Sequence, residues 1–152
     1  MAVREIKKFK DPILKQKCQP VTIFDEKLRL LTMDMRDTML HGNGIGLAAP
    51  QIGEPIAVIV VKKQSQKGTY IVVNPEIVKQ SIYTNLATEG CLSYPGMAAK
   101  IRRPNSVTVK GQTVQGGNVQ LTAVGLEARI FCHEIDHLHG DCKVAKGKVV
   151  KG

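Results

Sequence analysis

The sequence predicts an α+β fold of mostly antiparallel sheets, packed around a central helix that bears candidate ligands, with an amphipathic helix near the N-terminus. Three observations predict it: an apolar period of three to four residues in the first third, two pairs of β-branched runs joined by turns, and a second helical stretch near the C-terminus. Because helix, strands and helix follow in blocks, alternating βαβ units are excluded. With 152 residues, 43% of them hydrophobic, the chain is long enough for one domain with one core.

The N-terminal helix is expected over Phe24–Leu40. Asp25 is a suitable N-cap and Gly42 lies just beyond the end. The apolar residues that recur at helical spacing are Phe24, Leu28, Leu31, Met35 and Met39. One face of this helix should therefore be buried.

Four strands are expected to form two hairpins. Ile56–Val61 and Thr69–Val73 are β-branched runs separated by a polar turn at residues 63–68. Ser106–Lys110 and Asn118–Val124 flank a glycine-rich turn in the same way.

The second helix is expected over Gly125–His139 and contains a chemical signal. His133 and His137 are four residues apart, so both imidazoles lie on one face of the helix and can reach one metal ion. Glu134 follows the first histidine, where a carboxylate can take the proton of a water molecule. This H-E-x-x-H arrangement is typical of metal-dependent hydrolases.

A working site of this type needs three protein ligands. The metallopeptidase pattern H-E-x-x-H-x-x-G-x-x-H fits as far as Gly140, but its last position is Lys143, a poor ligand. Downstream residues that stay open as ligands are His139, Asp141 and Cys142. The upstream candidate is Cys91, whose thiolate would suit Zn or Fe(II).

A glycine-rich segment at residues 42–53 is the third unusual feature. Its alternate glycines would let a ligand or another backbone approach closely. A dinucleotide-binding loop is rejected because a helix, not a strand, leads into it.

Three segments together, G-I-G-L-A-A-P-Q at 44–51, E-G-C-L-S at 89–93 and H-E-I-D-H-L-H-G at 133–140, resemble the signature motifs of the peptide deformylases, in the same order. The resemblance covers the chain up to Gly140 and implies a Cys-His-His metal site made of Cys91, His133 and His137. It implies one divalent metal ion, Fe(II) in the cell, with Zn, Ni or Co as alternatives.

The resemblance also implies roles for other residues. Glu134 would be the general base, while the Gln51 amide and the Leu92 backbone N–H would donate to the oxyanion. Glu89 would pair with Arg103. The residues expected to bind the substrate are Gly44, Ile45, Gly46, Leu126 and Ile130. Leu126 and Ile130 share a helix face with the two histidines, which places the metal at the edge of an apolar pocket for a methionine side chain.

The expected function is removal of the N-formyl group from the formyl-methionine of newly made polypeptides, with release of formate. A metallopeptidase of the H-E-x-x-H type is one alternative, and a catalytically silent, basic ribosome-associated protein is another. The Lys143 mismatch and the cysteine segment count against the first. The presence of Glu134, Cys91 and Gln51 counts against the second.

The composition of the chain limits which partners and which cellular location can be expected. The net charge of +9 comes from scattered lysines with few aromatics between them, which is typical of a solvated surface rather than a DNA-reading one; transient ribosome contact stays open. No apolar run is long enough for a membrane, and four cysteines without a C-x-x-C pair suggest reduced thiols, so we expect a cytoplasmic protein. Residues 1–140 are expected to form the catalytic domain and 141–152 a lysine-rich C-terminal tail. Cys132 stands where the family usually has Gln.

Overall fold

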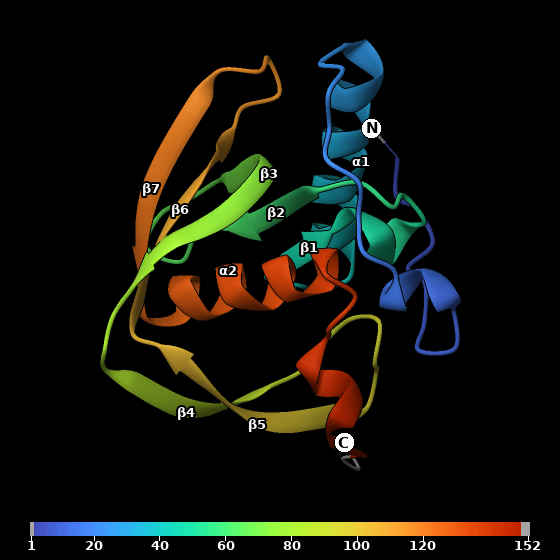
Figure 1. Ribbon diagram of the computed structural model, residues 1–152. Coiled ribbons are helices and arrows are strands. Elements are labelled where there is room, and N and C mark those ends of the chain that lie inside the picture. The colour runs from blue at the N-terminus through green and yellow to red at the C-terminus, as the bar shows by residue number, and fades with distance from the viewer. Residues whose placement is uncertain (1, 150–152) are drawn as a thin grey trace.

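The computed structural model describes residues 2–149, which fold into two long helices and two antiparallel sheets (Figure 1). The helices are α1 (Glu26–His41) and α2 (Gly125–Leu138). Short 3-10 turns are η1 (Pro12–Lys15), η2 (Ala49–Ile52) and η3 (Lys143–Lys146). The strands are β1 (Gly46–Ala48), β2 (Val58–Lys62), β3 (Thr69–Gln80), β4 (Thr84–Glu89), β5 (Met97–Pro104), β6 (Ser106–Gln112), β7 (Asn118–Val124) and β8 (Lys148–Val149).

The larger sheet has five strands in the order β1-β2-β3-β6-β7, and the smaller one has the order β4-β5-β8. The two predicted hairpins are confirmed as β2–β3, with Val60 opposite Ile71, and β6–β7, with Val109 opposite Leu121. β3 also pairs with β6 and so joins the two hairpins into one sheet, although this pairing shifts register after Val73 and again after Ile77.

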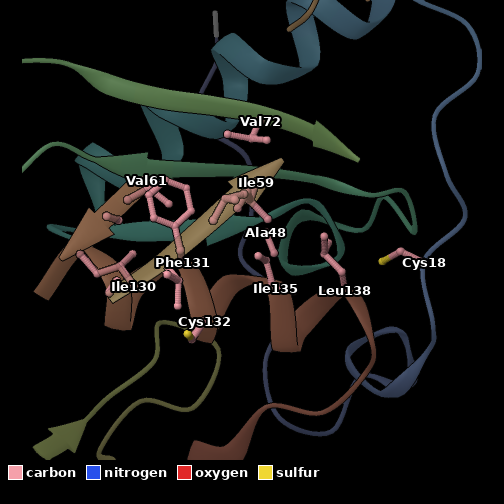
Figure 2. Close-up of a cluster of buried hydrophobic side chains, with 14 residues drawn as sticks. Cys18, Ala48, Ile59, Val61, Val72, Ile130, Phe131, Cys132, Ile135 and Leu138 are labelled. Carbon is pink, nitrogen blue, oxygen red and sulfur yellow. The ribbon is translucent and has the colours of Figure 1, made fainter. Parts of the chain in front are cut away.

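Helix α2 lies between the two sheets and crosses the middle of the molecule (Figure 1). Figure 2 shows Phe131, Ile135 and Leu138 projecting from α2 towards β2, the strand that carries Ile59 and Val61. Phe131 has 0% of its surface exposed. The helix is thus held by the largest core of the domain, which fixes the position of every side chain that it carries.

Strand β2 is buried on both faces, since its residues alternate between two cores. Ile59 and Val61 belong to the core on α2, whereas Val58 and Val60 belong to a second core. Helix α1 supplies the second core with Leu28, Leu31, Met35 and Met39, the face that the spacing predicted. Asp25 caps this helix, as expected, by accepting a hydrogen bond of 3.0 Å from the Leu28 N–H.

The strands β1 and β5 were not predicted, and β4 was expected only as a polar, strand-like stretch before Cys91, because these sequences lack an apolar run. β4 reads T-N-L-A-T-E, and only Glu89 among its residues is buried. These strands form from tertiary pairing rather than from local propensity. They nevertheless matter most for function, because β1 contains Gly46 and the loop from β4 to β5 contains Cys91.

The segment predicted as a C-terminal tail folds back onto β5 as far as Val149. Cys142 and Val144 are buried there in a third, smaller core with Leu14, Tyr94 and Ile101. Residues 150–152 of that tail lie outside the described part of the chain. Within that part, no helix is long and apolar enough to cross a membrane.

Candidate metal centre and active site

Four side chains of the types that bind metal ions lie close together at α2: Cys91, His133, His137 and Cys142. Their donor atoms all lie within 4.8 Å of one another, and Cys91 Sγ is 3.2 Å from His137 Nε2. The three predicted ligands are therefore brought together, from the α2 helix and from the loop after β4. Cys142, which stayed open from sequence, joins them from the chain just beyond α2.

The chemistry of this cluster fits a metal ion. Thiolate and imidazole donors are those that zinc and iron prefer in sites of this kind. His133 Nδ1 is 3.0 Å from Glu89 Oε1, which orients the ring and leaves Nε2 for a metal. Burial lowers the pKa of His133, but the Glu134 carboxylate and further partners outweigh it and raise that pKa to about 10. The surroundings of the ring therefore favour positive charge.

Glu89 is the centre of a buried network that supports His133. Arg103 donates to both carboxylate oxygens at 2.9 Å, and Arg129 Nη1 donates to Oε2 at 2.7 Å. Burial raises the pKa of Glu89, but the hydrogen bonds from Arg103 and His133 outweigh it and lower that pKa to about 2. The carboxylate is ionised and stays oriented towards the histidine.

Asp136 extends this network to the C-terminal segment. It accepts a hydrogen bond of 2.6 Å from Arg103 Nη1 and one of 3.1 Å from Lys143 Nζ. Lys143, which occupies the last ligand position of the metallopeptidase pattern, is thus ion-paired with Asp136 and lies outside the donor cluster.

Glu134 lies at the wall of the site, 4% exposed. Its Oε1 is buried and has no hydrogen-bond partner among the described residues. Burial raises the pKa of this carboxyl. A Cβ at Gly46 would lie 2.6 Å from Glu134 Oε2, so the glycine of β1 leaves the room that the carboxylate occupies.

The side chain of Gln51 is held by a hydrogen bond to the backbone at the start of η2, the short turn to which Gln51 belongs. Its Oε1 accepts from the Ala48 N–H at 2.9 Å, which orients the amide nitrogen. Nε2 then donates to Ser93 Oγ at 3.1 Å and lies 3.6 Å from Cys91 Sγ. The Gln51 amide, the predicted oxyanion donor, therefore lies beside the sulfur of Cys91, a predicted metal ligand.

A cavity of about 450 Å³ opens onto this chemistry. All the predicted substrate-binding residues line it, as do Gln51, Cys91, Leu92, His133 and Glu134. Ile130 is buried, whereas Ile45 and Leu126 are 41% and 49% exposed and form the open rim. His137 was expected to share this wall but is fully buried and is not among the residues that line the cavity.

The two thiols of the cluster influence each other. The hydrogen bond that they share is the largest cause of a raised pKa at Cys91 and of a lowered pKa at Cys142.

Two supporting residues escaped the sequence reasoning. Arg129 precedes His133 by four residues, so the helical period could have placed it on the ligand face. Ser93 has no such signal, because its contact with Gln51 depends on two loops that are 42 residues apart.

Residues 3–148 match the family model described as polypeptide deformylase. The chain is 47% identical over 140 residues to a peptide deformylase of Natranaerobius thermophilus, which covers 92% of this chain and 89% of that relative. The crystal structure of peptide deformylase from Thermotoga maritima superposes with a TM-score of 0.90 at 37% identity and covers 100% of both chains. A class I type b peptide deformylase from Acinetobacter baumannii with Met-Ala-Ser bound gives a TM-score of 0.90 at 36% identity, over 95% of this chain and 99% of that one.

Proposed function

This chain belongs to the polypeptide deformylase family, whose members remove the N-formyl group from newly made polypeptides, and we propose that it catalyses this hydrolysis with Glu134 as general base. The observation that carries the proposal is the buried Glu134 Oε1, which lacks a protein partner among the described residues at the wall of the cavity. A carboxylate in this position is available for a water molecule and for the proton that water loses.

We propose that Cys91, His133 and His137 hold one divalent metal ion, which is Fe(II) in the cell, with Zn, Ni and Co as ions that the same donors accept. Such an ion, when bound, supplies Lewis acidity that lowers the pKa of a water molecule and polarises the formyl carbonyl.

The side chains around the ion move the protons. Glu134 takes one proton from the attacking water, and the water oxygen forms a bond to the formyl carbon. The Gln51 amide and the Leu92 N–H donate to the oxygen on which negative charge develops. Glu134 then returns the proton to the leaving nitrogen as the carbon–nitrogen bond breaks. Formate and a free α-amine are the products.

The apolar part of the cavity suits a methionine side chain. Ile45 and Leu126 at the rim and Ile130 at the wall would contact it. β1 is an edge strand of the larger sheet, so the backbone of residues 44–46 can pair with an extended substrate peptide. The Met-Ala-Ser bound to the Acinetobacter relative is a peptide of the expected product type.

We propose that the partners are nascent N-formyl-methionyl chains in the cytoplasm, with transient ribosome contact through the excess positive charge of the chain and no DNA partner. The catalytic domain is proposed as residues 1–140, with 141–152 attached to it as a tail that pairs with β5 as far as Val149.

The test is formate release from formyl-Met-Ala-Ser by anaerobically prepared, metal-loaded protein. Glu134→Gln should lower kcat by about a hundredfold or more with unchanged metal content, because a general base typically contributes that much. Glu127→Gln, on the same helix and bonded only at the surface to the Gln64 N–H among the described contacts, should leave kcat unchanged. No formate from the metal-loaded intact protein would overturn the proposal.

A further inference from the structure

We propose that Cys142 is a fourth ligand of this metal centre, so that a Cys₂His₂ set of side chains holds the ion. The inference rests on the proposed metal site and adds to it. Zinc bound by four such side chains alone is closed and tetrahedral, whereas a catalytic ion needs a position for water. In this chain water would therefore enter as a fifth ligand from the cavity side.

The spacing of the donor atoms fits a shared ion. Metal–sulfur and metal–nitrogen bonds of about 2.3 and 2.1 Å place tetrahedral ligand atoms roughly 3.4 to 3.8 Å apart. The four donor atoms here lie within 4.8 Å of one another. A contraction of about 1.4 Å at most therefore brings them to bonding positions, which small side-chain rotations can supply.

The backbone returns Cys142 to the site immediately after α2. Gly140 adopts a φ of +70°, and a Cβ there would lie 2.4 Å from the Lys15 carbonyl oxygen, so the turn is both left-handed and tightly packed. The Asp141 N–H then donates to the Asp136 carbonyl at 3.0 Å. Only a sharp reversal of this kind can bring a residue five positions after His137 back to the same ion.

The segment after Cys142 is held equally firmly. The Ala145 N–H donates to the Cys142 carbonyl at 3.1 Å, and Val144 is fully buried in the third core. Lys143 is ion-paired with Asp136 and Asp141, which ties the same segment to the ligand helix. The thiol is thus positioned in advance, at no further cost in ordering the chain.

The four donors differ in their relation to the cavity. Cys91 and His133 line it, whereas His137 and Cys142 do not. Cys142 therefore reaches the ion from the buried side, and the cavity side stays accessible to water and substrate. Two thiolates cancel the charge of a divalent ion, so this fourth ligand should hold the ion more tightly and make it a weaker Lewis acid.

The test is X-ray absorption spectroscopy of the full-length, zinc-loaded, anaerobically purified protein. The intact chain should give two sulfur scatterers at about 2.3 Å, and Cys142→Ser should give one. Cys132→Ser is the matched control: Cys132 is also a buried cysteine, but it lies within α2 and outside the donor cluster, so two sulfurs should remain. One sulfur in the intact protein would overturn the inference, and this reading does not depend on the folding of any variant.

Competition with a zinc chelator gives a second readout. Cys142→Ser and Cys142→Ala should bind zinc at least about tenfold more weakly than the intact chain, since even the loss of an outer-shell partner costs that much. Equal affinity would overturn the inference. Formate release is measured on the same samples: release with one sulfur refutes the fourth ligand alone, whereas two sulfurs without release refute the proposed function alone.

Discussion

Arg103 and Glu89 form a buried ion pair through two parallel hydrogen bonds of 2.9 Å, and the same carboxylate lies 3.0 Å from Nδ1 of His133 and orients its ring. The pairing of these two residues, which are 14 positions apart, was predicted from the sequence and is confirmed. Both residues belong to the smaller sheet, Glu89 on β4 and Arg103 on β5, and Glu89 reaches from there to His133 on α2. The geometry of the candidate metal site therefore depends on a contact between the smaller sheet and the helix.

Replacement of Arg103 by Ala should weaken both the metal site and the fold. Arg103 holds the Glu89 carboxylate that orients His133, so its loss should lower zinc affinity by about 10- to 100-fold. The free energy of unfolding should fall by about 3 kcal/mol or more, because the ionised Glu89 loses its largest buried partner. Chelator competition and urea denaturation measure the two effects. Arg102→Ala removes a neighbouring arginine that bonds to Thr84 at the surface, and it should change neither quantity; an unchanged zinc affinity in the Arg103 variant would contradict the orienting role.

Gly46→Ala should impair catalysis without unfolding the protein. The new Cβ would lie 2.6 Å from Glu134 Oε2 and 2.7 Å from Ile130 Cγ2, so the carboxylate must move. Misplacement of a reacting group by about 1 Å costs on the order of a hundredfold in rate, which should be visible in kcat for formate release. In Gly117→Ala the nearest atom is 3.5 Å from the new Cβ, and kcat should be that of the intact protein. Full activity in the Gly46 variant would show that the carboxylate does not need this position.

Phe131→Ala should lower the free energy of unfolding by about 3 to 5 kcal/mol. Its ring is fully buried between α2 and the larger sheet and contacts Tyr70 with ring centroids 5.7 Å apart, so truncation leaves a cavity in the main core. Urea denaturation measures the loss. Ile82→Ala, at a residue 93% exposed, should stay within about 0.5 kcal/mol of the intact protein. A similar value for both variants would place the stabilising core elsewhere.

Because the thiol of Cys18 is buried, we expect the folded protein to lose stability at alkaline pH. Burial raises the pKa of its thiol from 9.0 to about 11, because the thiolate is poorly solvated beside Leu138. The folded state holds this proton more tightly than the unfolded state does. The resulting stabilisation is therefore complete below pH 9.0 and is lost as the pH rises towards 11. Between these values the intact protein should lose about 2 to 3 kcal/mol more than Cys18→Val, measured by urea denaturation at each pH. Parallel curves for the two proteins would refute the assignment.

The sequence predicted the elements whose residues repeat with a regular apolar period. The face of α1 with Leu28 and Met35 and the two hairpins could be found in this way because their burial is periodic. The residues of the candidate site could not all be found from periodicity. His133 and His137 were visible because one helix carries both, whereas the association of Cys91 with them came only from the resemblance of whole motifs. The position of Cys142 depends on a tight turn against Lys15, a long-range contact with no local signal.

Helix α2 carries the two histidines of the proposed metal site on one side and packs against the main hydrophobic core on the other, as Figure 2 shows for the core. Ion binding and global unfolding are consequently linked equilibria. An ion at a concentration of about 100 times its Kd would add about 2.7 kcal/mol to the stability of the whole domain, provided that the unfolded chain does not bind it. The shift in denaturation temperature that each metal ion produces can therefore rank the ions by affinity, without an activity assay.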